Sequence, residues 1–351
     1  MSKFFSSRLS SLEAYVPGEQ PKDMAYIKLN TNESPFPPAP AVQRALTEDT
    51  VAKLRLYCDP EASRLKAALA DSFATDASRI FVSNGSDDIL NFAFLAFGEG
   101  GVAFPDISYG FYEVFARLHG ISAEKIPLAE DFSITPKDYF AKGKMVCIAN
   151  PNAPTGMALS LEEVEAIVKS NPDSVVLIDE AYVDFGGESC AALTKKYKNL
   201  LCVGTFSKSR SMAGARLGFA VADQALIADL ERVKYSTNPY NVNSLTQLLG
   251  VLTLENQAYY TENCQRIIEA RAYATKALEA LGFSVLPSSA NFIFAKSDRI
   301  GGEALYLALK ARGVLVRHFE KPRIADYNRI TVGTLADMQA LVAAVKDILS
   351  Q

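Results

Sequence analysis

The chain has 351 residues, of which 49% are hydrophobic, and a chain of this size usually folds as two domains rather than one. Its net charge of −4 offers no basic surface for a nucleic-acid backbone, so we expect small-molecule partners. No segment is apolar for long enough to be a signal peptide or to span a membrane, which predicts a cytoplasmic protein.

The five cysteines and two histidines are scattered along the chain. No CxxC pair is present, and neither His119 nor His318 has neighbours at the spacing of metal ligands. We therefore expect reduced cysteines, no metal site and no histidine-based catalysis.

Residues 1–40 are expected to form an N-terminal arm, because the stiff, proline-rich segment 35–40 separates them from the rest of the chain. Residues 41–245 alternate short apolar runs with segments of helical period, which is typical of βαβ units. Ser160 and Glu163 match a capping box and predict the start of one helix. The expected strands are 80–82, 102–104, 145–149, 175–178 and 200–203.

Residues 246–351 are expected to form a smaller α+β domain. A long helical region leads to Gly282 and is followed by expected strands at 283–286, 291–295, 314–316 and 329–332. The predicted fold class is α/β, with a doubly wound, mostly parallel sheet in the large domain, a small C-terminal domain and an N-terminal arm.

Polar residues follow each expected strand of the large domain, where ligands bind in open parallel sheets. These segments are 83–87, 105–109, 150–156, 179–182 and 205–208. Taken alone, Ser86 and Asp87 fit simple helix caps as well as a phosphate cradle, and Lys208 fits an ordinary surface lysine. Asp179 differs, because a carboxylate that ends a buried strand needs a partner.

Together these groups match the needs of a carbonyl cofactor that a lysine holds as a Schiff base. Such a cofactor requires an amine, a carboxylate for its pyridinium nitrogen, a flat face to stack on and donors for a phosphate.

Three motifs carry a resemblance to a known family. They are Asn-Pro-Asn-Ala-Pro-Thr-Gly at 150–156, Asp-Glu-Ala-Tyr at 179–182, and Thr-Phe-Ser-Lys at 205–208 with Arg216 eight residues later. In this order and spacing they resemble the fold type I, aspartate-aminotransferase-like enzymes that use pyridoxal 5'-phosphate. The flanking segments 12–18, 29–36, 239–243, 316–319 and 329–333 are similar to those of the histidinol-phosphate aminotransferase family.

The resemblance implies roles for the residues around the cofactor ring. Lys208 would hold the cofactor and shuttle the substrate proton, Asp179 would keep the pyridine nitrogen protonated, and Tyr182 would donate to the ring oxygen. Tyr109 would stack on the ring. The family often has an asparagine at the position of Ala153, so either Asn152 takes over the ring-oxygen contact or that contact is weakened.

The resemblance also implies the groups that bind phosphate and substrate. Tyr57 would reach the phosphate of a neighbouring subunit, so the active unit would be a homodimer. The other expected phosphate ligands are Ser86, Asp87, Thr205, Ser207 and Arg216, and the expected substrate ligands are Tyr15, Asn32, Arg317 and Arg329, with Arg323 as a further candidate on proximity alone.

The implied reaction is ping-pong transamination of L-histidinol phosphate with 2-oxoglutarate in histidine biosynthesis. Three alternatives compete with it. One is another enzyme of this cofactor class, such as threonine-phosphate decarboxylase or an aromatic-amino-acid aminotransferase, and a second is a non-catalytic regulatory or binding protein of the same fold. The third, a nicotinamide dehydrogenase, lacks the G-x-G-x-x-G motif it requires.

Overall fold

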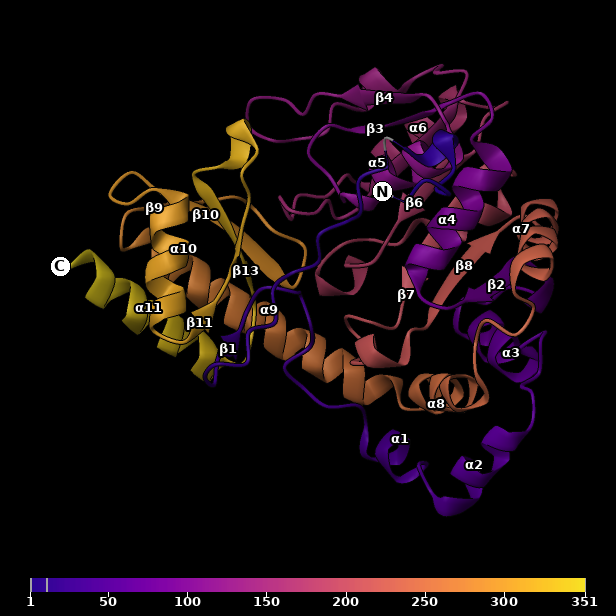
Figure 1. The fold of residues 1–351 in the computed structure, drawn as a ribbon, viewed down its shortest axis with the longest axis horizontal. Helices are drawn as coiled ribbons and strands as arrows, with labels where there is room; N and C mark the ends of the chain where they lie inside the picture. The colour runs from indigo at the N-terminus through magenta and orange to yellow at the C-terminus, as the bar shows by residue number, and fades with distance from the viewer. Residues whose placement is uncertain (1, 11, 351) are drawn as a thin grey trace.

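The computed structural model describes residues 2–10 and 12–350, so positions 1 and 11 of the expected arm lie outside the described residues. Its larger sheet has seven strands in the order β2-β8-β7-β6-β5-β3-β4 (Figure 1). Strand β8 alone points opposite to the other strands of this sheet, which confirms that the sheet is mostly parallel. The strands are β2 (Ile80–Ser83), β3 (Val102–Pro105), β4 (Ala123–Ile126), β5 (Met145–Ala149), β6 (Val176–Asp179), β7 (Leu200–Thr205) and β8 (Gly218–Ala222).

Two of these strands, β4 and β8, were missing from the sequence prediction. The edge strand β4 is partly exposed and contains Glu124 and Lys125, so it lacks the apolar run of a buried strand. Strand β8 is fully buried but begins at Gly218, where a Cβ atom would lie 2.4 Å from the backbone carbon of Gly85. This close packing fixes the turn at Gly85, which leads from β2 into the helix that begins at Ser86.

Helices cover both faces of the large sheet. One hydrophobic core joins the sheet to α4 (Ser86–Phe97), α5 (Phe111–His119) and α7 (Gln224–Thr237). The core on the other face includes α3 (Ser63–Ser72), α6 (Leu161–Ser170) and α8 (Ser244–Glu255). The predicted capping box is confirmed, since the Ser160 side chain accepts from the Glu163 N–H at the start of α6.

The C-terminal part is a smaller α+β unit, as expected. Its antiparallel sheet has the order β12-β13-β10-β9, and the long helix α9 runs to it from the end of α8 (Figure 1). The strands of this sheet are β9 (Phe283–Val285), β10 (Phe292–Ser297), β12 (Arg317–His318) and β13 (Tyr327–Thr331). The helices of this part are α9 (Gln257–Glu279), α10 (Gly302–Ala311) and α11 (Leu335–Leu349).

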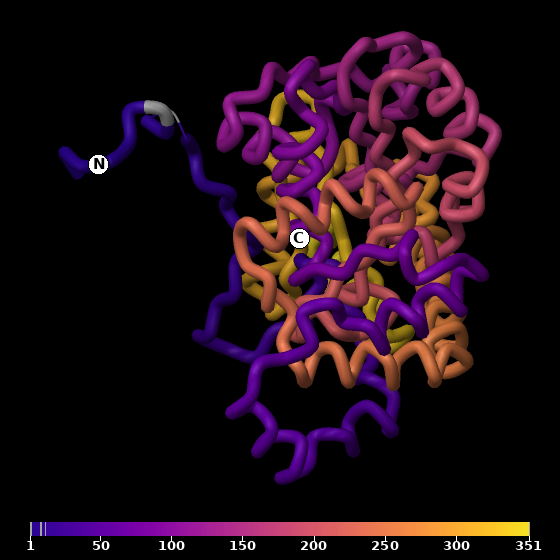
Figure 2. The backbone as a smooth tube through the Cα atoms, turned by 90° about the vertical axis from the view of Figure 1, so that its right-hand side faces the viewer, coloured from indigo at the N-terminus to yellow at the C-terminus, as the bar shows by residue number. Residues whose placement is uncertain are grey.

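One part of the N-terminal segment packs against the C-terminal part, and another part projects from the molecule. Strand β1 (Ile27–Lys28) pairs with β11 (Val314–Leu315), and Leu29 is buried in the core of the C-terminal part, so the arm is not wholly outside a core. The first part of the segment projects from the body (Figure 2), whereas Tyr15 packs against Phe111. After the proline-rich stretch come α1 (Pro40–Arg44) and α2 (Glu48–Ala52).

Short 3₁₀ helices connect several of these elements. They are Ser7–Leu9, Lys53–Arg55, Ala77–Arg79, Pro136–Tyr139, Val183–Phe185, Cys190–Lys195, Ala213–Ala215 and Pro322–Ile324. Helix α8 begins at Ser244, so it contains residue 245, and it packs on α3 of the large domain through Gly250 and Leu65. The division of the chain at residues 40 and 245 stays a proposal.

Among the helices of the described residues, none combines the length and the apolar character needed to cross a lipid bilayer.

Candidate active site

The carboxyl ends of the central strands open into a cavity of about 340 Å³. Strands β6 and β7 end at this cavity, and helix α4 begins there. Parallel strands direct their following loops to one edge of the sheet. Most of the side chains expected around the cofactor line it, namely Ser86, Asp87, Tyr109, Asp179, Tyr182, Thr205, Ser207, Lys208 and Arg216.

Asp179 lies at the buried side of the cavity, at the end of β6, and is only 4% exposed. The Tyr112 hydroxyl donates to its Oδ2 at 2.8 Å, and the Ala181 N–H donates to its Oδ1 at 3.2 Å. Burial raises the pKa of this carboxyl from 3.8 to about 6. Within the described residues it forms no ion pair, so a cationic ligand atom is the partner it lacks.

Lys208 provides an amine in the same cavity. Its Nζ donates to the Thr31 carbonyl at 3.2 Å and lies 5.8 Å from the centre of the Tyr182 ring. The Tyr182 hydroxyl in turn accepts from Asn32 Nδ2 at 3.0 Å. No carboxylate of the described part of the chain pairs with Lys208, so its amine is not already committed to a salt bridge.

The opposite side of the cavity has the features of an anion site. Gly85, with φ of +87°, turns the chain from β2 into α4, and the first backbone N–H groups of that helix lack helical partners. The hydroxyls of Thr205 and Ser207 lie 2.9 Å apart beside it. The alternative that Ser86 or Asp87 caps the helix is wrong, because the N-cap position is Gly85 and no side chain caps this end.

Asp87 links two other residues of the cavity. Its Oδ2 accepts from Arg216 Nη2 at 3.0 Å and its Oδ1 accepts from the Tyr109 hydroxyl at 2.7 Å. Burial and the Asp87 carboxylate raise the pKa of Tyr109 well above 10, so this phenol stays a donor. Since the carboxylate of Asp87 is occupied, its backbone N–H is the group it can offer to an anion.

A second cavity of about 360 Å³ adjoins the first and shares Tyr109, Tyr182 and Lys208 with it. The expected substrate ligands Tyr15, Asn32, Arg317 and Arg329 all line it. The Tyr15 ring stacks on Phe111 with centroids 4.2 Å apart and forms part of the wall.

The two arginines of this second cavity have no acidic partner within the described residues. Arg329 Nη2 donates to the Asn30 carbonyl at 2.9 Å, and its Nε is buried without a hydrogen-bond partner. Arg317 reaches the carbonyls of Val16 and Pro17 at 3.5 Å. Burial lowers the pKa of Arg329, because its positive charge is removed from water, and a bound anion would compensate that charge.

Three expected residues do not line either cavity. The Asn152 amide is used within the protein, since its Oδ1 accepts from Ser108 and its Nδ2 donates to Ile107 and Thr155. These bonds hold the amide within the protein, and the ring-oxygen contact of Asn152 stays a prediction.

The other two lie further out. Arg323 donates to the carbonyls of Leu128 and Ala129, so proximity in sequence was misleading. Tyr57 is 82% exposed and stacks on Tyr240 with centroids 4.4 Å apart, outside the cavities of its own chain.

The sequence reasoning missed Tyr112, which holds Asp179 from α5. Tyr112 lies in the first turn of α5, and no motif of the sequence marked it. The sequence reasoning also missed Thr31, Phe319 and Lys321, which contribute to the walls of the cavities. Thr31 and Phe319 lie in the segments 29–36 and 316–319 that resemble the family, but the resemblance gave neither of them a role, and no motif marks Lys321.

The residues present fit pyridoxal phosphate. The first cavity offers a buried carboxylate that lacks a cation, an amine without a salt bridge and a helix N-terminus with hydroxyls beside it. Its volume of about 340 Å³ is within the range of small-molecule sites.

Comparisons with known proteins agree with this site. Residues 25–345 match the family model described as aminotransferase class I and II. The chain is 50% identical to a histidinol-phosphate aminotransferase of Marinomonas sp. (strain MWYL1) over 353 residues, covering 99% of this chain and 100% of the relative.

Two solved structures share the fold. The histidinol-phosphate aminotransferase of Sinorhizobium meliloti in complex with pyridoxal-5'-phosphate has a TM-score of 0.89 and 23% identity, covering 100% of this chain and 98% of the other. The L-threonine-O-3-phosphate decarboxylase of Porphyromonas gingivalis has a TM-score of 0.82 and 24% identity, with coverage of 93% and 100%. The fold by itself thus does not separate the two activities. On the family model and the near-full-length identity, the chain belongs to the aminotransferase class I and II family, and within it to the histidinol-phosphate aminotransferases.

Proposed function

We propose that this chain transfers an amino group from L-histidinol phosphate to 2-oxoglutarate, which gives imidazole-acetol phosphate and glutamate, with pyridoxal 5'-phosphate as cofactor. The observation that carries the proposal is the pair of unbalanced charges in adjoining cavities. Asp179 is a buried carboxylate without a cation, and Arg317 and Arg329 are guanidiniums without a carboxylate among the described residues. A cationic ring nitrogen and an anionic substrate would satisfy both.

The residues of the first cavity would hold the cofactor. Lys208 would be its covalent attachment point, and Tyr109 would offer a flat face to its ring. The hydroxyls of Thr205 and Ser207, the N–H groups of Ser86 and Asp87, and Arg216 would hold its phosphate at the helix N-terminus.

The reaction needs a proton to leave and rejoin the substrate carbon that carries the amine. When bound, pyridoxal phosphate supplies an electron-accepting ring that stabilises the charge left at that carbon. Lys208 Nζ, which lies where the two cavities meet, would carry the proton. The Asp179 carboxylate would hold a proton at the ring nitrogen, and the Tyr182 hydroxyl would donate to the ring oxygen.

The second cavity would bind the two substrates in turn, as ping-pong kinetics require. Arg317 and Arg329 can grip a phosphate or a carboxylate, because the planar guanidinium matches two oxygens at once. Tyr15 and Asn32 would complete the anion site. The imidazole-bearing donor and the dicarboxylate acceptor would therefore use the same charges.

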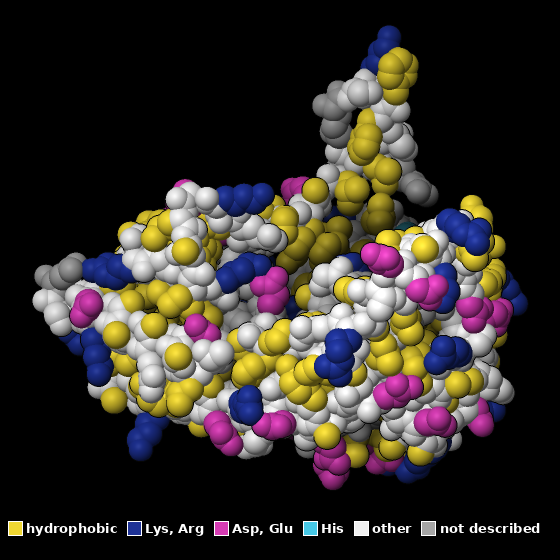
Figure 3. All heavy atoms as spheres, turned by 90° about the horizontal axis from the view of Figure 1, so that it is seen from below, with side chains coloured by type: hydrophobic (Ala, Val, Ile, Leu, Met, Phe, Trp, Pro, Cys, Tyr) yellow, Lys and Arg dark blue, Asp and Glu magenta, His cyan; other side chains and the backbone are white. Residues whose placement is uncertain are grey.

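We infer that the active unit is a homodimer. Tyr57 is exposed in the single chain and lies outside its own cavities, as expected for a residue that serves a neighbouring site. Hydrophobic side chains are also exposed on the projecting arm (Figure 3), including Phe4 at 85% and Val16 at 71%. Burial of these surfaces in a partner interface would be favourable. A cytoplasmic location stays a prediction.

The decisive experiment compares amino donors. The purified protein is assayed with histidinol phosphate, phenylalanine and threonine phosphate, each with 2-oxoglutarate as acceptor, and release of CO₂ is followed in parallel. We expect kcat/KM for histidinol phosphate to exceed that for phenylalanine by at least about 100-fold, because a doubly charged phosphate can balance both arginines and the single carboxylate of phenylalanine cannot. Equal values, or CO₂ release from threonine phosphate, would overturn the substrate assignment.

A separate experiment tests the cofactor assignment. Borohydride treatment of the loaded protein should fix the cofactor to Lys208, and peptide mapping should find it there. Lys208→Ala should prevent this fixation, whereas Lys321→Ala, which removes another lysine of the second cavity, should leave it intact. Fixation to a different residue in the wild-type protein would contradict the role of Lys208.

A further inference from the structure

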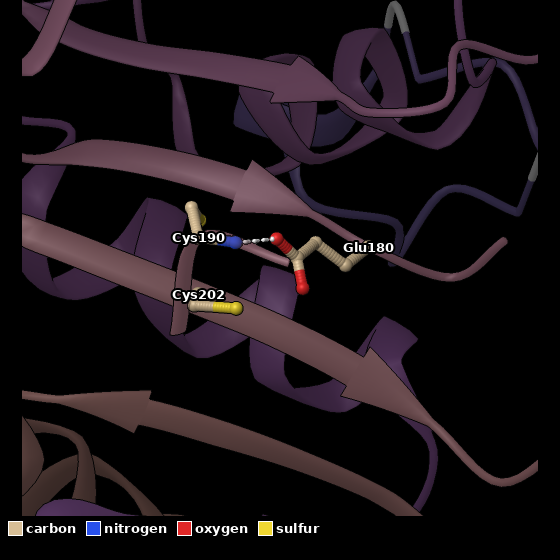
Figure 4. A group of neighbouring side chains, drawn as sticks. All are labelled: Glu180, Cys190 and Cys202. Atoms are coloured by element: carbon tan, nitrogen blue, oxygen red, sulfur yellow. Dashed lines mark hydrogen bonds between the residues drawn. The ribbon is translucent and has the colours of Figure 1, made fainter. Parts of the chain in front are cut away.

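Outside the two cavities, Glu180, Cys190 and Cys202 bring three potential metal ligands together. One carboxylate oxygen and the two Sγ atoms all lie within 4.8 Å of one another. The three residues come from different segments, after β6, at the start of the 3₁₀ helix Cys190–Lys195, and in β7. Figure 4 shows the Glu180 carboxylate directed toward the two cysteines.

The cluster is buried, with Glu180 only 6% exposed and each cysteine 1% exposed. The Glu180 carboxylate is held in place, since it accepts from the Cys190 N–H and from the Ser189 hydroxyl, both at 2.6 Å. Each carboxylate oxygen has a second lone pair, so these bonds leave it able to bind a cation. No residue of the cluster lines the cofactor or substrate cavity.

We propose that Glu180, Cys190 and Cys202 form a buried binding site for one thiophilic divalent cation of the Zn²⁺ class. Two sulfur ligands and one carboxylate oxygen select a soft or borderline ion over Mg²⁺ or Ca²⁺, which prefer sites made of oxygen alone. The Ser189 hydroxyl or a water completes a four-coordinate site. A bound ion would tie the loop after β6 to β7, next to Asp179.

Charge balance favours such an ion in a buried position. Cys190 and Cys202 are both free cysteines, so neither sulfur is tied up in a disulfide. A divalent cation that replaces the two thiol protons releases them to solvent. The net charge of the cluster is then the same before and after binding.

The test uses the full-length protein loaded with its cofactor. Equilibrium dialysis against Zn²⁺ should give one ion per chain, and Cd²⁺ in its place should give an ultraviolet thiolate charge-transfer band. Cys190→Ser and Cys202→Ser should each abolish tight binding, and Glu180→Gln should weaken it. Cys147→Ser is the matched control, because Cys147 is equally buried but lies outside the cluster, and it should bind the ion as the wild type does.

X-ray absorption of the wild-type Zn²⁺ protein keeps the test valid if a variant does not fold. We expect sulfur ligands at about 2.3 Å and a shorter oxygen or nitrogen shell. The proposal is wrong if the wild-type protein retains no ion, if the absorption spectrum contains no sulfur shell, or if folded Cys190→Ser and Cys202→Ser proteins bind as tightly as the Cys147→Ser control.

Discussion

The hydroxyl of Tyr112 donates to Oδ2 of Asp179 at 2.8 Å, and both side chains are almost completely buried. With the Ala181 N–H on Oδ1, this bond fixes the plane of the carboxylate that faces the first cavity. Tyr112 does not line the cavity, so it acts through Asp179 as a positioning residue.

Replacing Tyr112 with Phe removes the hydrogen bond and keeps the ring. The hydroxyl lowers the pKa of Asp179, so its loss should raise that pKa further above 6 and leave more of the carboxyl neutral. Cofactor affinity should fall by roughly tenfold near pH 7, as expected for a hydrogen bond to a charged group. Fluorescence titration from pH 5 to 9 should show the midpoint of cofactor binding moved upward.

Tyr139→Phe is the control for this change. Tyr139 is equally buried, but no side-chain hydrogen bond links it to Asp179. Loss of the Tyr139 hydroxyl should leave the pH midpoint of cofactor binding unchanged. An unchanged midpoint in Tyr112→Phe would show that the bond has only a structural role.

Asp179→Asn should stabilise the cofactor-free protein while weakening cofactor binding. The folded state raises the pKa of Asp179 from 3.8 to about 6, so folding favours the neutral carboxyl. The wild type therefore loses stability as pH rises through this window, whereas an amide does not titrate. The melting temperature of the variant should exceed that of the wild type above pH 6, and the difference should vanish near pH 4.

The comparison of melting temperatures must use protein freed of cofactor, because a bound cationic ring would reverse the effect. With cofactor added, the wild type should gain more than the variant. A variant that is less stable than the cofactor-free wild type at pH 7.5 would contradict the view that Asp179 is an unpaired buried charge.

Gly85→Ala should disturb the anion end of the cavity. Only glycine adopts a φ of +87° with a ψ of 166° without backbone strain, and an added Cβ would lie 2.6 Å from Arg216 Nη2. We expect a loss of about 1–3 kcal/mol in the free energy of unfolding and a clear loss of cofactor affinity. Urea unfolding and cofactor titration measure the two effects.

Gly120→Ala separates backbone strain from the collision with Arg216. Gly120 also has a positive φ, of +70°, but its Cβ would meet no atom within 4 Å. This variant should lose stability and keep cofactor affinity. If Gly85→Ala binds cofactor as well as Gly120→Ala does, the turn is not part of the anion site.

Mixed dimers test whether Tyr57 serves the neighbouring site. Tyr57→Ala and Lys208→Ala homodimers should each have little activity, for different reasons. After subunit exchange, half of the dimers are mixed, and each has one site with an intact Lys208 and an intact Tyr57 from the other chain. Activity should therefore recover to about a quarter of the wild-type value. Mixed dimers that form without recovery would place Tyr57 outside the active site.

The sequence by itself determined the chemistry of the site and the outline of the fold. Short apolar runs revealed the central strands, because strands buried on both faces contain little else. The motifs that follow those strands identified Asp179, Tyr182 and Lys208 as neighbours, since parallel strands bring their carboxyl ends to one edge. Composition could not reveal β4, a partly exposed edge strand, or β8, which packs through Gly218.

Only the tertiary structure decided which groups meet across long stretches of chain. Tyr112 donates to Asp179, and Lys208 donates to the Thr31 carbonyl. Tyr15 and Arg329 line the same cavity. Each of these pairs joins residues that are far apart in sequence. The same holds for Asn152, whose amide is used by its own surroundings, and for the Glu180, Cys190 and Cys202 cluster, whose cysteines showed no metal-ligand spacing. Local patterns determine strands and turns, whereas such contacts depend on how the whole chain packs.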